Sequence, residues 1–164
     1  MHYFAYAYII LIVANKFDNN NGFFTALVFT LGWITYISAQ YIFRGKYYSA
    51  YLACGHIFLA LILVVMAISG SDLIKIILWV FSGFGAGTVF CIKEVLKKHG
   101  GNSANTLETS ENYGHILGLL ACIGAYAIFD TITAPIIVAS VCAILTVFLV
   151  FILSYNKTKE FNYD

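Results

Sequence analysis

The side chains that could do chemistry in this sequence are few, and each has apolar neighbours. His56 lies near the middle of an apolar stretch, where an imidazole could exchange protons if neighbouring groups shift its pKa. Gln40 could line a polar path or cap a contact between helices. Trp33 and Trp79 lie well inside apolar stretches, away from the membrane interfaces where tryptophan is enriched, and could line a cavity for an apolar ligand. These four residues are our candidate lining of a small-molecule site.

Each candidate also has a purely structural interpretation. His56 could be a neutral histidine that is hydrogen-bonded to another helix, and both tryptophans could pack in a core or face lipid. Lys75 stands about one turn inside its apolar stretch, where its ammonium group is expected to reach the outer headgroups rather than a solute. At this stage both interpretations stay open.

Catalytic and cofactor chemistry has little support. The carboxylates fall at or beyond the ends of the apolar stretches, so a proton-coupled mechanism has no obvious carrier. The glycine-rich GFGAG lies within an apolar stretch and cannot cradle a phosphate as a strand-to-helix turn does. The four cysteines form no CxxC pair and have no histidine at metal-ligand spacing. We therefore expect no enzyme, no metal and no cofactor.

The elements that position these residues are expected to be helices in a lipid bilayer. Hydrophobic residues make up 61% of the 164 residues and charged residues 10%, too few charges to cover a water-soluble surface. A helix needs about 20 apolar residues to cross a membrane. Cutting the chain at its polar interruptions gives apolar segments at 3–15, 23–43, 47–69, 73–92, 114–129 and 134–155, with a polar cytoplasmic loop at 93–113. The sequence thus predicts one all-α domain over 1–164, a polytopic transmembrane bundle of about six helices with a short first segment.

The charge distribution predicts the orientation, because Lys and Arg are retained on the cytoplasmic side of a membrane. With six crossings, one side carries Arg44, Lys46, Lys93, Lys97, Lys98, Lys157 and Lys159, whereas the other carries Lys16 and Lys75. Both termini are therefore expected in the cytoplasm, with a bacterial inner membrane as the default location. The net charge of +1, without a basic face, argues against a nucleic-acid partner.

Two glycine pairs predict where helices approach closely. Gly83 and Gly87 form one GxxxG ridge, and Gly114 and Gly118 form another. We expect the helices over 73–92 and 114–129 to pack tightly within the bundle. Self-association of whole chains is the alternative use of these ridges.

The segments from 23 to 155 together resemble one six-helix half of a major facilitator superfamily transporter. The connection SAQYIFRGKYYSAY is similar to the loop motif of that superfamily, with Gly45 and Lys46, next to Arg44, at its glycine and basic positions. Ser38 and Ile42 replace the leading glycine and the aspartate of the motif, so the acidic residue associated with gating is missing. The later stretch ENYGHILGLLACIGAY is similar to the superfamily's Glu-Arg-Gly pattern followed by a helix.

This resemblance implies transport of a small solute, which such proteins hold between two six-helix halves. One chain supplies one half, so transport would require a second copy or a second membrane subunit. The alternative is a non-transporting membrane interaction protein, such as an accessory subunit, an immunity-type protector or a transporter remnant. The helix number and the glycine ridges favour transport, and the scarcity of charge within the apolar segments favours the alternative.

Overall fold

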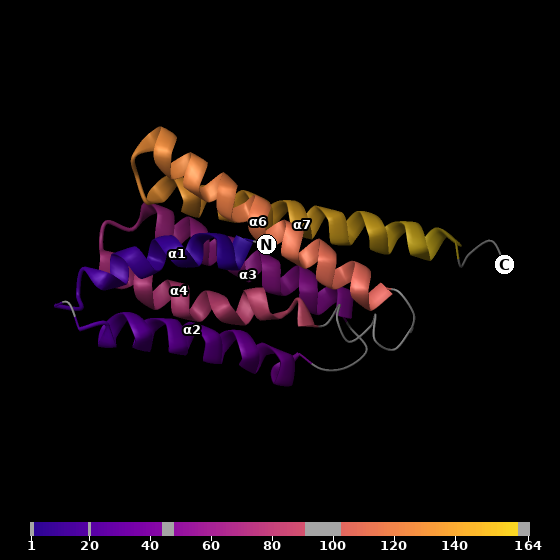
Figure 1. Ribbon diagram of the computed structural model, residues 1–164. Coiled ribbons are helices and arrows are strands. Elements are labelled where there is room, and N and C mark those ends of the chain that lie inside the picture. Colours follow the sequence, from indigo (N-terminus) through magenta and orange to yellow (C-terminus); the bar gives the residue numbers. More distant parts are fainter. Residues whose placement is uncertain (1, 20, 44–47, 91–102, 161–164) are drawn as a thin grey trace.

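The described part of the chain is helical. The computed structural model describes residues 2–19, 21–43, 48–90 and 103–160, and these ranges contain no strand. They contain the helices α1 His2–Asn15, α2 Phe23–Ile42, α3 Tyr48–Ile68, α4 Asp72–Gly87, α6 Ser103–Phe129 and α7 Thr133–Glu160, labelled as in Figure 1. The prediction of an all-α fold is confirmed.

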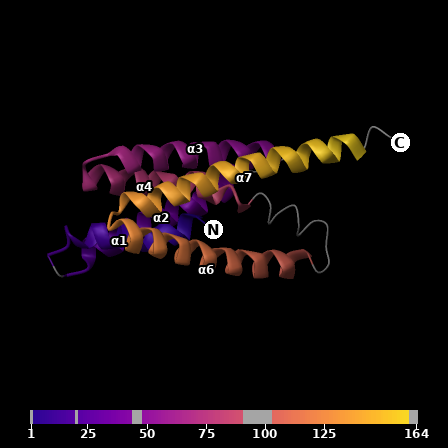
Figure 2. The ribbon, with the colours of Figure 1, turned by 90° about the horizontal axis from the view of Figure 1, so that it is seen from above.

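The helices lie side by side in an elongated bundle (Figures 1 and 2). The turns that follow α1, α3 and α6 lie at one end of the bundle, which we name the turn end. The C-terminus of α7 points away from the turn end. The helices joined by these turns therefore run in opposite directions, as expected of a chain that crosses a bilayer repeatedly.

Four helices have the length and composition of a membrane span. The qualifying stretches are Phe23–Ile42 of α2, Ala50–Ile68 of α3, Asn112–Phe129 of α6 and Thr133–Ile152 of α7. Each begins and ends within a few residues of an apolar segment that the sequence predicts. Hydrophobic patterning therefore located these four apolar stretches correctly.

The other two helices, α1 and α4, are shorter. They have 14 and 16 residues, and a rise of 1.5 Å per residue makes them about 21 and 24 Å long, against a hydrocarbon core about 30 Å thick. The sequence predicts a helix over 73–92, whereas α4 ends at Gly87, and residues 91 and 92 lie outside the described ranges. Glycines lower the helix propensity of its last turns, and the Thr88 hydroxyl donates to the Gly85 carbonyl at 2.7 Å, which favours ending the helix here.

The start of α6 corrects the predicted loop. Residues 103–113 were predicted to be loop, but α6 begins at Ser103, well before the predicted start at Gly114. The stretch 103–113 contains no proline or glycine, and a helix in water satisfies its own backbone hydrogen bonds, so polar composition alone does not prevent helix formation. Similarly, α7 extends to Glu160, beyond the predicted end at residue 155.

One apolar core joins all the described helices. Its larger members are Ile10 and Val13 of α1, Val28 and Tyr36 of α2, Leu59, Leu63 and Met66 of α3, Ile76 and Trp79 of α4, Cys122 of α6 and Ile136 of α7. Helix α1 contacts α2, α4, α6 and α7, so it lies within the bundle rather than at its edge. The core therefore links the two short helices to the long helices around them.

Candidate functional site

The two tryptophans of the predicted site lie in different surroundings. Trp79 is 1% exposed and is among the largest side chains of the core. Trp33 is half-buried and packs against the edge of the same core. Its ring forms edge-to-face pairs with Phe29 and Tyr36, at centroid distances of 6.2 and 5.4 Å. Trp79 is therefore a core residue, whereas Trp33 belongs to an aromatic row along α2.

His56 and Gln40, the other two predicted lining residues, lie on α3 and α2. His56 is buried in α3, and its Nδ1–H donates to the Leu52 carbonyl at 2.8 Å, because a carbonyl oxygen can only accept. Gln40 is half-buried on α2, beside Ala39, which is fully buried. The four predicted lining residues are thus distributed over three helices and over core and edge positions.

A recess that the sequence did not indicate lies between α3 and α7. It has a cavity volume of about 240 Å³ and is lined by Ile57, Ala60, Leu61, Val64, Ile144, Val147 and Phe148. This volume is below the roughly 300–1,000 Å³ typical of small-molecule sites. The lining is wholly apolar and includes none of the four predicted residues, so the recess is suited to hydrocarbon rather than to a polar solute.

Several polar side chains inside the bundle connect neighbouring helices. The Thr35 hydroxyl of α2 donates to the Val80 carbonyl of α4 at 2.6 Å. The Ser140 hydroxyl of α7 donates to the Ala60 carbonyl of α3 at 3.3 Å. Hydroxyl groups that bond across helices in this way stabilise bundles in lipid. These hydroxyl groups are therefore used for packing.

Glycines on one face of α4 bring it against α2. A methyl group added to Gly83 would come within 2.8 Å of both the Gly32 carbonyl oxygen and the Tyr36 backbone nitrogen. A methyl group on Gly87 would collide with the Tyr36 carbonyl oxygen. The GxxxG ridge of α4 therefore lies directly on the backbone of α2, the close approach that small residues permit.

The opposite face of α4 approaches α3 through Gly85, which the GxxxG pattern does not include. A methyl group on Gly85 would lie 2.5 Å from the Gly55 carbonyl oxygen and 3.0 Å from Leu59 Cβ. Gly55 in turn lies against the Thr88 side chain. Helix α4 is thus held between α2 and α3 by backbone contacts on both sides.

The second predicted glycine pair lies on α6, and the predicted loop motif lies in a part of the chain that the structure does not describe. On α6, Gly114 is buried and Gly118 is half-buried, whereas Gly124 has no atom within 4 Å of an added methyl group. Residues Arg44, Gly45 and Lys46 lie outside the described ranges.

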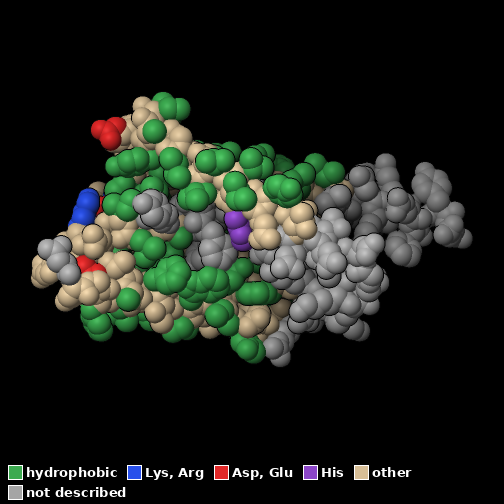
Figure 3. All heavy atoms as spheres, viewed as in Figure 1, with side chains coloured by type: hydrophobic (Ala, Val, Ile, Leu, Met, Phe, Trp, Pro, Cys, Tyr) green, Lys and Arg blue, Asp and Glu red, His purple; other side chains and the backbone are tan. Residues whose placement is uncertain are grey.

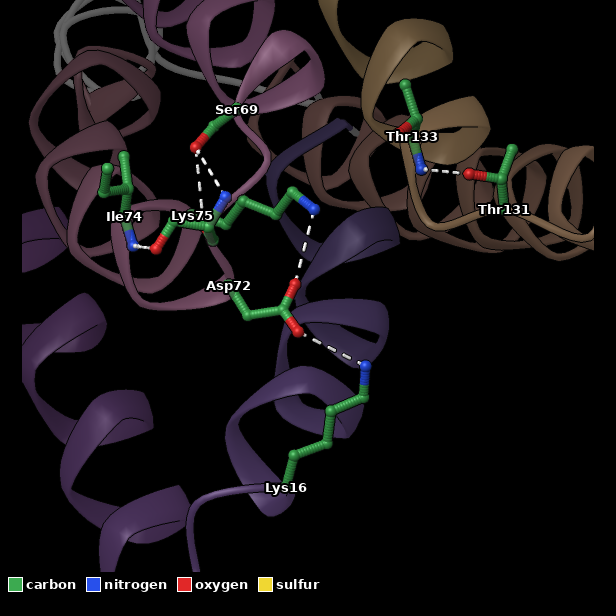
Figure 4. Close-up of polar contacts among 8 residues, drawn as sticks. Lys16, Ser69, Asp72, Ile74, Lys75, Thr131 and Thr133 are labelled. Atoms are coloured by element: carbon green, nitrogen blue, oxygen red, sulfur yellow. Dashed lines mark hydrogen bonds and ion pairs between the residues drawn. The ribbon is translucent and has the colours of Figure 1, made fainter.

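An ion-pair cluster at the turn end joins the turn after α1 to the start of α4 (Figure 4). Asp72, the first residue of α4, lies 3.3 Å from Lys16 Nζ through Oδ2 and 3.3 Å from Lys75 Nζ through Oδ1. We name Lys16, Asp72 and Lys75 the turn-end triad. Lys75 was expected to reach the outer headgroups, and at the turn end its ammonium group lies beside Asp72. The spacing of Asp72 and Lys75 by one helical turn was the available signal for this pair.

Asp18 lies in the turn between α1 and α2 and caps α2. Its carboxylate accepts the backbone N–H groups of Phe24 at 2.6 Å and of Thr25 at 2.7 Å. The left-handed backbone of Gly22, with φ of +71°, leads the chain into this helix. Burial acts to raise the pKa of Asp18, but hydrogen bonds from Thr25 and Phe24 outweigh it, so the pKa is lowered. Asp18 therefore remains ionised and serves the start of α2.

The outer surface of the bundle is apolar along its length. Hydrophobic side chains cover most of the described face in Figure 3, and the lysine and acidic side chains visible there lie near the turn end. Exposure is greatest on α6, where 11% of the apolar stretch is buried compared with 50% for α3. Among the described residues, no three His, Cys, Asp or Glu side chains gather to hold a metal ion.

Four apolar helices of spanning length and an apolar outer surface define a membrane-embedded, multi-pass helical protein. The charged residues whose side chains the structure describes, Lys16, Asp18, Asp72, Lys75 and Asp130, lie at the turn end. Comparison of the chain with protein-family models, curated proteins and solved structures gives no match.

Proposed function

We propose that the chain crosses a bacterial inner membrane six times, with both termini in the cytoplasm and the turn end outside. The alternating direction of the helices supports this topology. The sequence supports it as well, because with six crossings seven Lys and Arg residues fall on the cytoplasmic side, whereas Lys16 and Lys75 fall on the other. The two lysines on the outer side share the Asp72 carboxylate, which offsets part of their charge.

Cysteine labelling in intact cells tests this topology. A membrane-impermeant maleimide is expected to label Asn21→Cys, in the turn after α1, without permeabilisation. Thr158→Cys, near the end of α7, is expected to react only after the cells are opened. Labelling of Thr158→Cys in intact cells would contradict the proposed topology.

The function we propose is that of one half of a two-part, transporter-like assembly that moves a small uncharged or amphipathic solute. The observation that carries this proposal is the low burial of α6, a helix of spanning length that the rest of the chain leaves mostly uncovered. On its exposed side, Gly124 has open space and lies among Leu117, Leu120 and Ile128, all of which are exposed. Small residues between larger ones are the surfaces on which membrane helices associate.

The mass of the intact complex tests the assembly. Native mass spectrometry from lipid nanodiscs is expected to give a homodimer or a stoichiometric complex with a second membrane subunit. Gly124→Leu is expected to shift this complex toward single chains, because the new side chain fills the open space beside Gly124 that a partner helix would use. Ala26→Leu adds similar bulk to an exposed position of α2 and should leave the mass unchanged. A single chain under all conditions would refute the proposal.

A non-transporting interaction protein remains the second candidate, and one observation favours it. Trp79 and His56, two of the predicted lining residues, are 1% and 4% exposed, so both are buried inside the bundle. Solute counterflow into proteoliposomes discriminates the two functions. If the assembly forms but exchanges no solute, and Trp33→Ala changes nothing, the interaction role is supported.

A further inference from the structure

The turn-end triad contains more positive charge than its carboxylate neutralises. Two ammonium groups, from the turn after α1 and the first turn of α4, approach the two oxygens of Asp72 (Figure 4). Two lysines and one aspartate give the triad a formal charge of +1. Of the other acidic residues at this end, Asp18 is committed to capping α2, and Asp130 is exposed in the turn before α7.

Lys75 also has hydrogen-bond donors to spare. It is 9% exposed, and an ammonium group carries three donors. Among the described residues, Asp72 is the acceptor within hydrogen-bond distance of Lys75 Nζ, at 3.3 Å. This distance exceeds the roughly 2.7–2.9 Å of a strong charge-assisted hydrogen bond. A buried ammonium group with one long contact requires further oxygen atoms, because leaving its donors unsatisfied is costly.

The position of the triad determines which oxygen atoms are available. The triad lies at the turn end, where α4 begins, and in a membrane-embedded bundle this end is expected among the lipid headgroups. Lys16 is the accessible member, with a side chain 56% exposed, whereas the Lys75 side chain is 11% exposed. The start of α4, which carries the positive end of the helix dipole, lies beside them.

We propose that the turn-end triad binds a phosphate group, with Lys75 as the principal donor and Lys16 as the outer donor. The +1 charge of the triad complements the single negative charge of a phosphodiester in a lipid headgroup. Asp72 holds both ammonium groups in place and limits the positive charge. The same chemistry would accept free inorganic phosphate, so the experiment must separate these two sources. The inference depends on membrane embedding and not on a transport function.

Native mass spectrometry of the full-length chain in detergent tests this site with three probes. These are dioleoyl phosphatidylglycerol, dioleoylglycerol, which has the same chains without phosphate, and inorganic phosphate. The lysine variants Lys75→Met and Lys16→Met are each expected to weaken phosphatidylglycerol binding about tenfold, the loss that corresponds to one charge-assisted hydrogen bond. Asp72→Asn is expected to strengthen binding, because a competing acceptor loses its charge.

Asp130→Asn is the control, since it removes an exposed charge at the same end and should change nothing. Dioleoylglycerol should bind the native chain and the lysine variants equally. A loss confined to phosphatidylglycerol assigns the site to a lipid, and a loss confined to inorganic phosphate assigns it to the free ion. If the lysine variants bind phosphatidylglycerol as tightly as the native chain does, and also bind inorganic phosphate as tightly, the proposal is overturned. Lys16→Met keeps the test decisive if Lys75→Met fails to fold, because Lys16 is largely exposed.

Discussion

Gly85→Val is expected to unfold the bundle at a much lower temperature than the native chain, since it drives a side chain into the backbone of α3. Even the first added carbon would lie 2.5 Å from the Gly55 carbonyl oxygen and 3.0 Å from Leu59 Cβ. These atoms belong to a packed helix and cannot rotate away. We expect a cost of about 3 kcal/mol, the upper part of the range for overpacking. Thermal unfolding in detergent, followed by tryptophan fluorescence, measures the effect.

Gly70→Val is the matched control for this substitution. Gly70 lies in the turn between α3 and α4, and an added methyl group there meets no atom within 4 Å. The same change in size should therefore leave the melting temperature nearly unchanged. Equal melting temperatures for Gly85→Val and Gly70→Val would contradict the close approach of α4 to α3.

Trp79→Ala is expected to produce the second large loss of stability. The Trp79 side chain is 1% exposed in the core, so its removal leaves a cavity. Replacing a buried tryptophan by alanine costs about 3–5 kcal/mol. For a chain of this size, the melting temperature should fall on the order of 10 °C. Trp79→Phe should recover part of the loss, because it refills much of the space.

Trp33→Ala provides the comparison, because Trp33 is half-buried and lies at the edge of the core. Its loss of stability should be clearly smaller than that of Trp79→Ala. Any loss of solute exchange in Trp33→Ala at retained stability would support its predicted lining role. If Trp79→Ala kept native stability while losing a bound solute, Trp79 would line a site instead of filling the core.

Apolar runs were sufficient to predict the long helices, because a spanning helix satisfies its backbone internally and must present apolar side chains to lipid. The same logic failed at residues 103–113, where a polar helix leaves the apolar region and hydropathy no longer distinguishes helix from loop. The end of α4 was also misplaced. There, glycine-rich sequence and a local hydroxyl bond weaken the helix within an apolar run.

The candidate site was less predictable, because partners distant in sequence decide each role. GxxxG spacing identified Gly83 and Gly87 as a smooth face, yet nothing in it named α2 as their neighbour or indicated Gly85 on the opposite side. Likewise, Asp72 and Lys75 are one turn apart, but Lys16 joins them from the turn after α1. The burial of Trp79 depends on α1, α2 and α3 packing against α4, which one sequence does not reveal.

The unequal helix lengths create a hydrophobic mismatch around the bundle. Helices α1 and α4 are about 21 and 24 Å long, whereas the 20-residue apolar stretch of α7 extends about 30 Å. The bilayer must thin around the bundle, or the longer helices must tilt, to match these unequal lengths. Bilayer thickness depends on lipid chain length, so the chain length of the surrounding lipids is one of the conditions that determine the stability of this fold.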